Sequence, residues 1–130
     1  MNNSYKLLKV KKINVDNNYL ILFRHLNINL NKGEVYFSFF KNLKEKNWKN
    51  NSKITQNFYA VKGKFRFLIL NKIKQKKSIV TISHQNNNIL KIYPNNWYKI
   101  KPLKKNSILL NQVNLKKNKY KKYEKLFKSV

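Results

Sequence analysis

The sequence predicts an all-β protein, a sandwich or a barrel, and three observations support this expectation. Short runs of strand length are separated by turn residues. Apolar and polar residues alternate in several of these runs, as in strands with one buried face. A helical period occurs only near the C-terminal end. The strand-like runs lie at 5–15, 19–24, 33–41, on either side of Gly63, and at 78–83, 89–93, 97–100 and 107–113.

The first two runs differ in their patterning. The first places lysines between its apolar residues, whereas the second, YLILFR, is continuously apolar, so we expect that strand to be buried on both faces. Asp16, Asn17 and Asn18 predict the turn between them. His25 follows the second run. A single histidine at a strand end is more often a structural hydrogen-bonding group than a catalytic one.

The third run, GEVYFSFFK, is the most strand-like segment of the chain. Val35, Phe37 and Phe39 share one face of the predicted strand. Tyr36 and Ser38 share the other face. Two interpretations stay open for this second face: it lines a pocket, or it is half-buried with local hydrogen bonds.

Residues 48–70 are the central stretch of the predicted fold, with two expected strands on either side of Gly63. Phe65, Phe67 and Ile69 fall on one face of a strand by alternation. Gly63 precedes them between two lysines, and glycine tolerates a positive φ. We therefore expect a tight reversal that joins two antiparallel strands, with any site near their polar entry.

The remaining runs predict four further strands and a helix. The basic loop at 71–77 has no aromatic side chain to stack a base, so we interpret it as a solvated hairpin end. Proline at 94 and at 102 bounds the strand at 97–100. Tyr120, Tyr123 and Phe127 have the spacing i, i+3 and i+7, which predicts a short amphipathic helix over residues 119–130.

Length and composition predict one domain spanning residues 1–130. The chain has no cysteine, two histidines and four acidic residues, which excludes disulfides and thiolate metal sites. We expect no metal and no cofactor. No apolar run is long enough for a membrane span, and no signal peptide is evident, so we expect a cytoplasmic protein without membrane contact.

The formal net charge is +26, which has two explanations. A polyanion such as RNA is the usual partner of so basic a chain. Lysine, asparagine, isoleucine and tyrosine are also the residues encoded by codons rich in A and T, and the lysines are spread along the whole chain. A solvated basic surface is therefore the favoured interpretation, and nucleic-acid binding stays open as the alternative.

Two separated blocks form a more specific pattern. The first block contains GEVYFS, WKNN, TQN and VKGKFRF within residues 33–67, and the second contains IYPNNWYKIKPL and LLN within residues 92–111. Together they resemble the cupin-superfamily sugar-nucleotide epimerases and isomerases related to dTDP-4-dehydrorhamnose 3,5-epimerase. The resemblance spans roughly residues 30–118, which is most of the chain.

The resemblance implies a cupin double-stranded β-helix, or jelly roll, with a short C-terminal helix. It implies a homodimer with a pocket inside each barrel for a nucleotide-linked deoxysugar of the dTDP-4-keto-6-deoxysugar class. The implied reaction removes a proton next to the keto group and returns it on the other face. The implied setting is the synthesis of a surface polysaccharide.

The chain departs from the family where a histidine base is expected. Lys49 and Asn51 occupy the positions of two motif histidines. Asparagine cannot act as a base, and lysine can do so only where burial or neighbouring charge lowers its pKa. Lys49 is therefore the predicted base and Tyr98 the predicted proton donor. A non-catalytic relative that binds a sugar nucleotide or a partner enzyme is the alternative.

The other predicted site residues are expected to bind substrate. Trp97 is expected to stack on a ring, Arg66 to bind a diphosphate bidentately, and Asn57 to bond a sugar hydroxyl. Asn51 and Tyr36 complete the set. Plain structural roles stay open for three of them: Trp97 in the core, Arg66 on an outer face, and Asn57 in a turn.

Overall fold

The computed structural model describes residues 4–22, 33–50, 52–71 and 75–114, and these contain eleven strands and no helix. The strands are β1 (Tyr5–Lys9), β2 (Lys11–Val15), β3 (Asn18–Leu22), β4 (Glu34–Phe40), β5 (Lys49–Asn50), β6 (Gln56–Lys62), β7 (Lys64–Asn71), β8 (Lys76–Ser83), β9 (Asn88–Ile92), β10 (Asn96–Pro102) and β11 (Ser107–Val113). The all-β prediction is thus confirmed. The predicted C-terminal helix lies outside the described residues.

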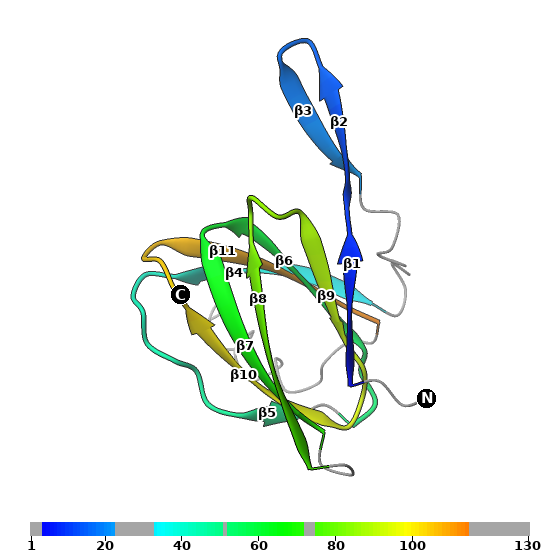
Figure 1. Ribbon diagram of the computed structural model, residues 1–130, viewed down its shortest axis with the longest axis vertical. Coiled ribbons are helices and arrows are strands. Elements are labelled where there is room, and N and C mark those ends of the chain that lie inside the picture. The colour runs from blue at the N-terminus through cyan, green and yellow to red at the C-terminus, as the bar shows by residue number, and fades with distance from the viewer. Residues whose placement is uncertain (1–3, 23–32, 51, 72–74, 115–130) are drawn as a thin grey trace, which may run out of the picture.

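Two antiparallel sheets enclose the core, in the order β1-β9-β6-β11-β4 and β5-β10-β7-β8. This arrangement is consistent with the expected jelly roll. The hairpin of β2 and β3 projects beyond the barrel formed by the other strands (Figure 1). The part of the chain that the structure describes contains no helix long and apolar enough to cross a membrane.

The core lies between the two sheets and is rich in phenylalanine. Phe65, Phe67 and Ile69 on β7 are 0%, 0% and 1% exposed, so the predicted alternation is confirmed. Phe58 on β6 meets Phe67 with ring centroids 4.9 Å apart. It also meets Tyr98 on β10 edge-on at 5.6 Å. Such tilted aromatic pairs stabilise a core beyond their buried area, and here they join the two sheets.

The predicted hairpin at Gly63 is wrong, although its positive φ is confirmed at 85°. β6 and β7 belong to different sheets and do not pair with each other. Gly63 is therefore the corner at which the chain passes from one sheet to the other. A Cβ atom at this position would overlap Ser107 Oγ and lie 2.7 Å from Ser107 Cβ. The corner thus needs glycine for both its conformation and its space.

The N-terminal predictions are corrected in two places. Residues 5–15 form two strands, with Val10 between them, and they belong to different sheets. Tyr19 on β3 is 56% exposed, so the expected burial of this run on both faces is wrong. Lys12 Nζ lies 4.2 Å from the centroid of the Tyr19 ring. The predicted turn is confirmed, because Asp16 and Asn17 have positive φ values of 46° and 65°.

A second apolar cluster lies on the side of the five-stranded sheet that faces away from the core. Tyr59, Ile89 and Leu110 are buried there together with Val10. Burial, and secondarily the neighbouring Tyr19, raise the pKa of Tyr59. Strand β6 therefore contributes to two clusters, since its Phe58 faces the core and its Tyr59 faces the second cluster.

Candidate functional site

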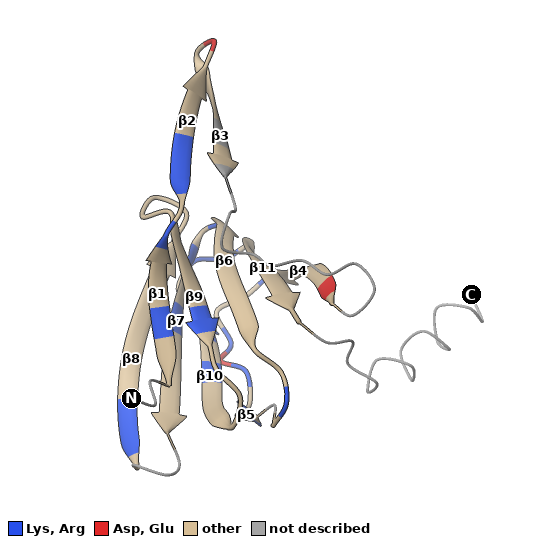
Figure 2. Ribbon diagram, turned by 90° about the vertical axis from the view of Figure 1, so that its right-hand side faces the viewer, with Lys and Arg blue, Asp and Glu red and all other residues tan. Residues whose placement is uncertain are grey.

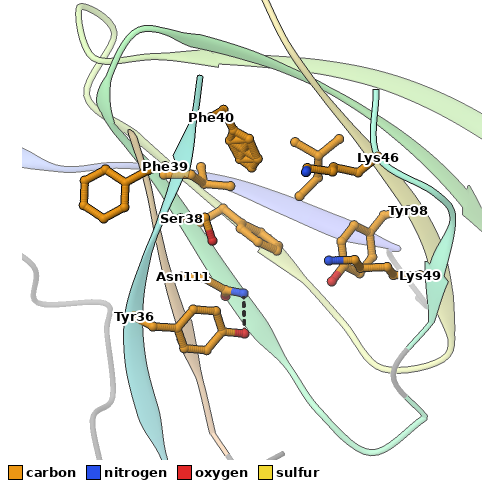
Figure 3. A pocket seen from close by; sticks show the side chains of 11 residues that line it. Tyr36, Ser38, Phe39, Phe40, Lys46, Lys49, Tyr98 and Asn111 are labelled. Carbon is orange, nitrogen blue, oxygen red and sulfur yellow. Dashed lines mark hydrogen bonds between the residues drawn. The ribbon is translucent and has the colours of Figure 1, made fainter. Parts of the chain in front are cut away.

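A cavity of about 350 Å³ lies between the two sheets (Figure 3). Its wall combines aromatic and aliphatic side chains with two lysines, two tyrosines, a serine and an asparagine. The lining residues are Tyr36, Ser38, Phe39, Phe40, Lys46, Lys49, Phe58, Tyr98, Ile100, Leu109 and Asn111. Apolar walls with a few polar groups are typical of small-molecule sites.

Strand alternation brings these side chains to one place. Tyr36, Ser38 and Phe40 share the inner face of β4, so the pocket interpretation of this face is the one that the structure supports. Lys49 on β5 is the register partner of Tyr98 on β10. Cross-strand partners have Cβ atoms about 5 Å apart, so Lys49 and Tyr98 form one part of the wall.

A chain of hydrogen bonds runs along the wall of the cavity. Gln56 Nε2 donates to Tyr98 Oη at 2.7 Å, and Asn111 Nδ2 donates to Gln56 Oε1 at 3.1 Å. Asn111 Nδ2 also donates to Tyr36 Oη at 2.9 Å. Both phenol oxygens accept in these bonds, so neither bond uses a phenol proton. The chain therefore fixes the positions of both phenol oxygens.

One polar atom of this wall lacks a partner. Asn111 is 5% exposed, and its Oδ1 is buried without a hydrogen bond to any described residue. A buried, unsatisfied acceptor costs about 1–3 kcal/mol. Such a cost is often explained by function or by a bound molecule.

The charge of the cavity is positive. Lys46 and Lys49 are lining residues, and no acidic residue is among them. The backbone N–H of Lys46 donates to Ile100 O at 2.8 Å, which holds this segment along β10. Lys46 Nζ lies 5.5 Å from the centroid of the Phe40 ring. A cavity with two cations and apolar walls suits a ligand with a negative charge and a flat or ring-shaped part.

Three of the predicted site residues lie together in this cavity: Lys49, Tyr98 and Tyr36. Lys49 is exposed, so it lacks the burial that the sequence argument required of a lysine base. Asn51 lies outside the described residues. The prediction that the polar entry of the 48–70 stretch forms part of a site therefore agrees with the position of Lys49.

Arg66 and Trp97 do not line the cavity. Their strand neighbours Phe67 and Tyr98 face inward, so Arg66 and Trp97 face the opposite side of the four-stranded sheet. Arg66 Nη2 lies 3.8 Å from Glu45 Oε2, and the other oxygen of this carboxylate, Oε1, lies 3.2 Å from Lys99 Nζ. Arg66 therefore has the outer-face position that was left open as an alternative, and Trp97 is not part of the buried core. The expected roles of Arg66 on a diphosphate and of Trp97 on a ring stay predictions.

Asn57 also lies away from the cavity. It alternates with Gln56 and Phe58, which face inward, and its Nδ2 donates to Gln112 Oε1 at 2.7 Å. Asn57 is 5% exposed and lies within β6. The turn alternative is therefore wrong, and the expected bond to a sugar hydroxyl stays a prediction.

The structure adds Gln56, Asn111, Lys46 and Ser38 to the candidate site. Gln56 and Asn111 stood inside the two resembling blocks, and Asn111 interrupts the apolar run SILL. A polar residue inside an apolar strand is a signal for a buried hydrogen bond. The identity of its partner depends on strand register, which the sequence did not reveal.

No described histidine lines the cavity. His84 lies in the turn before β9, with Nδ1 3.4 Å from Gly63 O, and it is exposed. His25 lies outside the described residues. Among the residues that the structure describes, no group of three or more His, Cys, Asp or Glu side chains is placed to hold a metal ion.

The cations of the described residues are spread over several strands. Lysine and arginine lie on β1, β2, β8 and β9 (Figure 2), and Lys46 and Lys49 line the cavity. This distribution matches the expected solvated basic surface more closely than a single nucleic-acid-binding face.

Sequence comparisons find no match, since no family model and no curated protein matches this chain. Solved structures do match. A dTDP sugar isomerase from Desulfovibrio desulfuricans G20 is 20% identical, with 85% of this chain and 76% of that chain covered, at a TM-score of 0.72. A sugar 3,4-ketoisomerase from Thermoanaerobacterium thermosaccharolyticum, in complex with TDP, is 16% identical, with coverages of 92% and 86%, at a TM-score of 0.76.

A third structure extends the likeness to the epimerases. The dTDP-4-dehydrorhamnose 3,5-epimerase from Bacillus anthracis str. Ames, with TDP and PPi bound, is 14% identical, with coverages of 88% and 74%, at a TM-score of 0.72. The likeness to cupin-type sugar-nucleotide enzymes that the two sequence blocks predicted is thus confirmed at the level of the fold. This chain has the fold of the dTDP-sugar isomerases and epimerases.

Proposed function

We propose that this protein is a sugar-nucleotide isomerase or epimerase that acts on a dTDP-4-keto-6-deoxysugar by removing a proton next to the keto group. One observation carries the proposal most directly. The cavity holds two fixed phenols and two lysines, without acidic residues, inside a fold shared with dTDP-sugar enzymes. We place the activity in the cytoplasm and in the synthesis of a surface polysaccharide, as the sequence resemblance implies.

The polar groups of the cavity suit different parts of such a ligand. Lys46 provides positive charge for the diphosphate. Tyr36, Ser38 and Asn111 provide hydrogen-bonding groups for sugar hydroxyls. The buried Oδ1 of Asn111 lacks a donor, which a hydroxyl brought close by a small shift of the wall would supply.

Tyr98 is the group best placed to move a proton to or from the sugar. Its oxygen is held by Gln56 Nε2, and its ring is packed edge-on against Phe58. A phenol fixed in this way can donate a proton in one direction only, which a stereospecific reaction requires. Lys49, its register partner, is the second group at this part of the wall.

A non-catalytic relative that only binds the sugar nucleotide is the second candidate. Two observations favour it: no described histidine lines the cavity, and Lys49 is exposed. A general base needs a position and a protonation state matched to its task. An exposed lysine meets the first requirement alone.

Solvent exchange separates the two candidates. We expect the protein to catalyse the exchange of deuterium from D₂O into dTDP-4-keto-6-deoxyglucose, at the carbon next to the keto group. Proton NMR at moderate salt measures this exchange. The ligand alone provides the background rate. Protection of the protein against heat by the ligand, without exchange above background, would favour the binding-only relative. Absence of both signals would refute the proposal and favour RNA binding, which the net charge of +26 raised.

The homodimer that the resemblance implies is also a proposal. Val35, Phe37 and Phe39 on β4 are 41%, 52% and 70% exposed, and they form an apolar row at the edge of the five-stranded sheet. Apolar side chains in such a row favour association. We expect sedimentation equilibrium to give a dimer for the protein and a monomer for Phe37→Lys.

The matched control is Ile79→Lys, which changes another exposed apolar residue, 68% exposed, on the four-stranded sheet. This variant should remain dimeric. A monomeric wild-type protein, or equal dissociation of both variants, would contradict a dimer formed through β4.

A further inference from the structure

The position of Lys49 gives this cavity a primary amine where the family pattern has a histidine. Lys49 lines the cavity and is the register partner of Tyr98 across β5 and β10. Figure 3 shows its side chain and that of Tyr98 at the same end of the cavity. An amine at this place can do more than accept a proton, because it is also a nucleophile toward a ketone.

We propose that Lys49 forms an imine with the keto carbon of its ligand. This inference rests on the proposed function, since it requires a keto sugar in the cavity. The neutral amine of Lys49 attacks the carbonyl carbon, a C–N bond forms, and the carbonyl oxygen leaves as water. The two N–H protons leave with that oxygen, and the imine nitrogen takes up one proton from solvent to give the protonated imine; no oxidant or reductant is consumed.

The imine would provide a route to proton exchange in a cavity that no described histidine lines. The positive nitrogen draws electrons away from the carbon next to the imine carbon. The proton on that neighbouring carbon is then lost to water. The C–H electron pair becomes the carbon–carbon double bond of a neutral enamine, while the pair of the C=N bond moves onto nitrogen. A proton then returns to carbon, and water hydrolyses the imine to release the ketone and free Lys49. Because the protonated imine makes the neighbouring C–H more acidic than the ketone does, a weaker base is sufficient to remove the proton.

The surroundings distinguish Lys49 from Lys46, the other lysine of the cavity. Lys46 Nζ lies 5.5 Å from the centroid of the Phe40 ring, so its amine is directed at an aromatic face and not at Tyr98. Lys49 lies on a strand beside a phenol, which can transfer protons while water is lost. The geometry therefore assigns anion binding to Lys46 and imine formation to Lys49.

Reductive trapping tests the assignment. The full-length protein is incubated with dTDP-4-keto-6-deoxyglucose and sodium cyanoborohydride, which reduces imines faster than ketones, and its intact mass and peptides are measured. We expect one adduct per chain, on Lys49, with the mass of the ligand less one oxygen atom. Trapping should become faster as pH rises, because the neutral amine is the reacting form.

Two matched variants define the site. Lys49→Arg keeps the positive charge but cannot form an imine, so it should lose the adduct, with at least a tenfold fall in exchange, and still be protected by the ligand against heat. Lys46→Arg should keep the adduct. Both residues are exposed, so neither change is expected to unfold the protein.

The outcomes are distinguishable from a failure of the proposed function. Exchange without an adduct, or with an adduct on Lys46 or on many lysines, would overturn the imine while leaving the isomerase proposal intact. Absence of exchange, adduct and heat protection in the wild-type protein would overturn both. Exchange together with an adduct confined to Lys49 would support both.

Discussion

Replacing Tyr98 with phenylalanine should lower the rate of deuterium exchange into dTDP-4-keto-6-deoxyglucose by about 100-fold or more, the usual contribution of a positioned acid or base. Tyr98 is 2% exposed, lines the cavity and is held by Gln56 Nε2 at 2.7 Å. The substitution removes the oxygen and keeps the ring, so the edge-on contact with Phe58 is retained. The loss should appear in kcat, since the hydroxyl is assigned to proton transfer.

The fold should survive this substitution. Removing the phenol oxygen leaves Gln56 Nε2 without that acceptor, which costs about 1–3 kcal/mol of unfolding free energy. Circular dichroism and urea unfolding would measure that cost separately from the rate.

Tyr36→Phe provides the matched control. It removes the other phenol oxygen of the same hydrogen-bonded chain, the acceptor of Asn111 Nδ2 at 2.9 Å. We assign Tyr36 to ligand binding, so its loss should raise KM more than it lowers kcat. Equal effects of the two substitutions on kcat, or a rate for Tyr98→Phe near that of the wild type, would contradict a proton-transfer role for Tyr98.

Gly63→Ala should lower the free energy of unfolding by about 2–6 kcal/mol, as the sum of backbone strain and overlap. Gly63 has a φ of 85°, which side chains rarely adopt. The new Cβ would also overlap Ser107 Oγ and lie 2.7 Å from Ser107 Cβ. Ser107 has little freedom to move, because its Oγ donates to Lys104 O at 2.6 Å. Urea unfolding at constant pH and salt measures the change.

A double substitution separates the two causes. Ser107→Gly removes the overlapping side chain, so Gly63→Ala should cost less in that background than in the wild type. The remaining cost reports the strain of the positive φ alone. An unchanged unfolding midpoint for Gly63→Ala in the wild-type background would mean that the chain does not turn at this corner as described.

The sequence was most informative where one strand face was buried. Alternation placed Phe65, Phe67 and Ile69 correctly in the core, and it assigned Tyr36 and Phe37 to opposite faces of one strand. It did not identify strand partners. Gly63 had the features of a hairpin, yet the same positive φ serves a corner between sheets, because periodicity describes one strand and not its neighbours.

The candidate site was predicted only in part, because alternation along one strand does not show which face lines a cavity or which strands are neighbours. Trp97 and Tyr98 are consecutive in a strand, so both cannot face one cavity, and the motif alone did not show which one does. Gln56 and Asn111 were missed because their roles depend on the register of β6 with β11, which brings them into contact across 55 positions of sequence.

Strand β6 belongs to two cores at once, and this position constrains how the sequence can drift. Its residues 56–60 are all buried, with Phe58 and Ala60 toward one cluster and Tyr59 toward the other. A change of volume at any of them therefore disturbs one of the two clusters or the hydrogen-bonded wall, because none of the five positions faces solvent. Strands with one solvated face, such as β8, lack this double requirement. Divergence to 14–20% identity from proteins of the same fold is therefore easiest to accommodate in those strands.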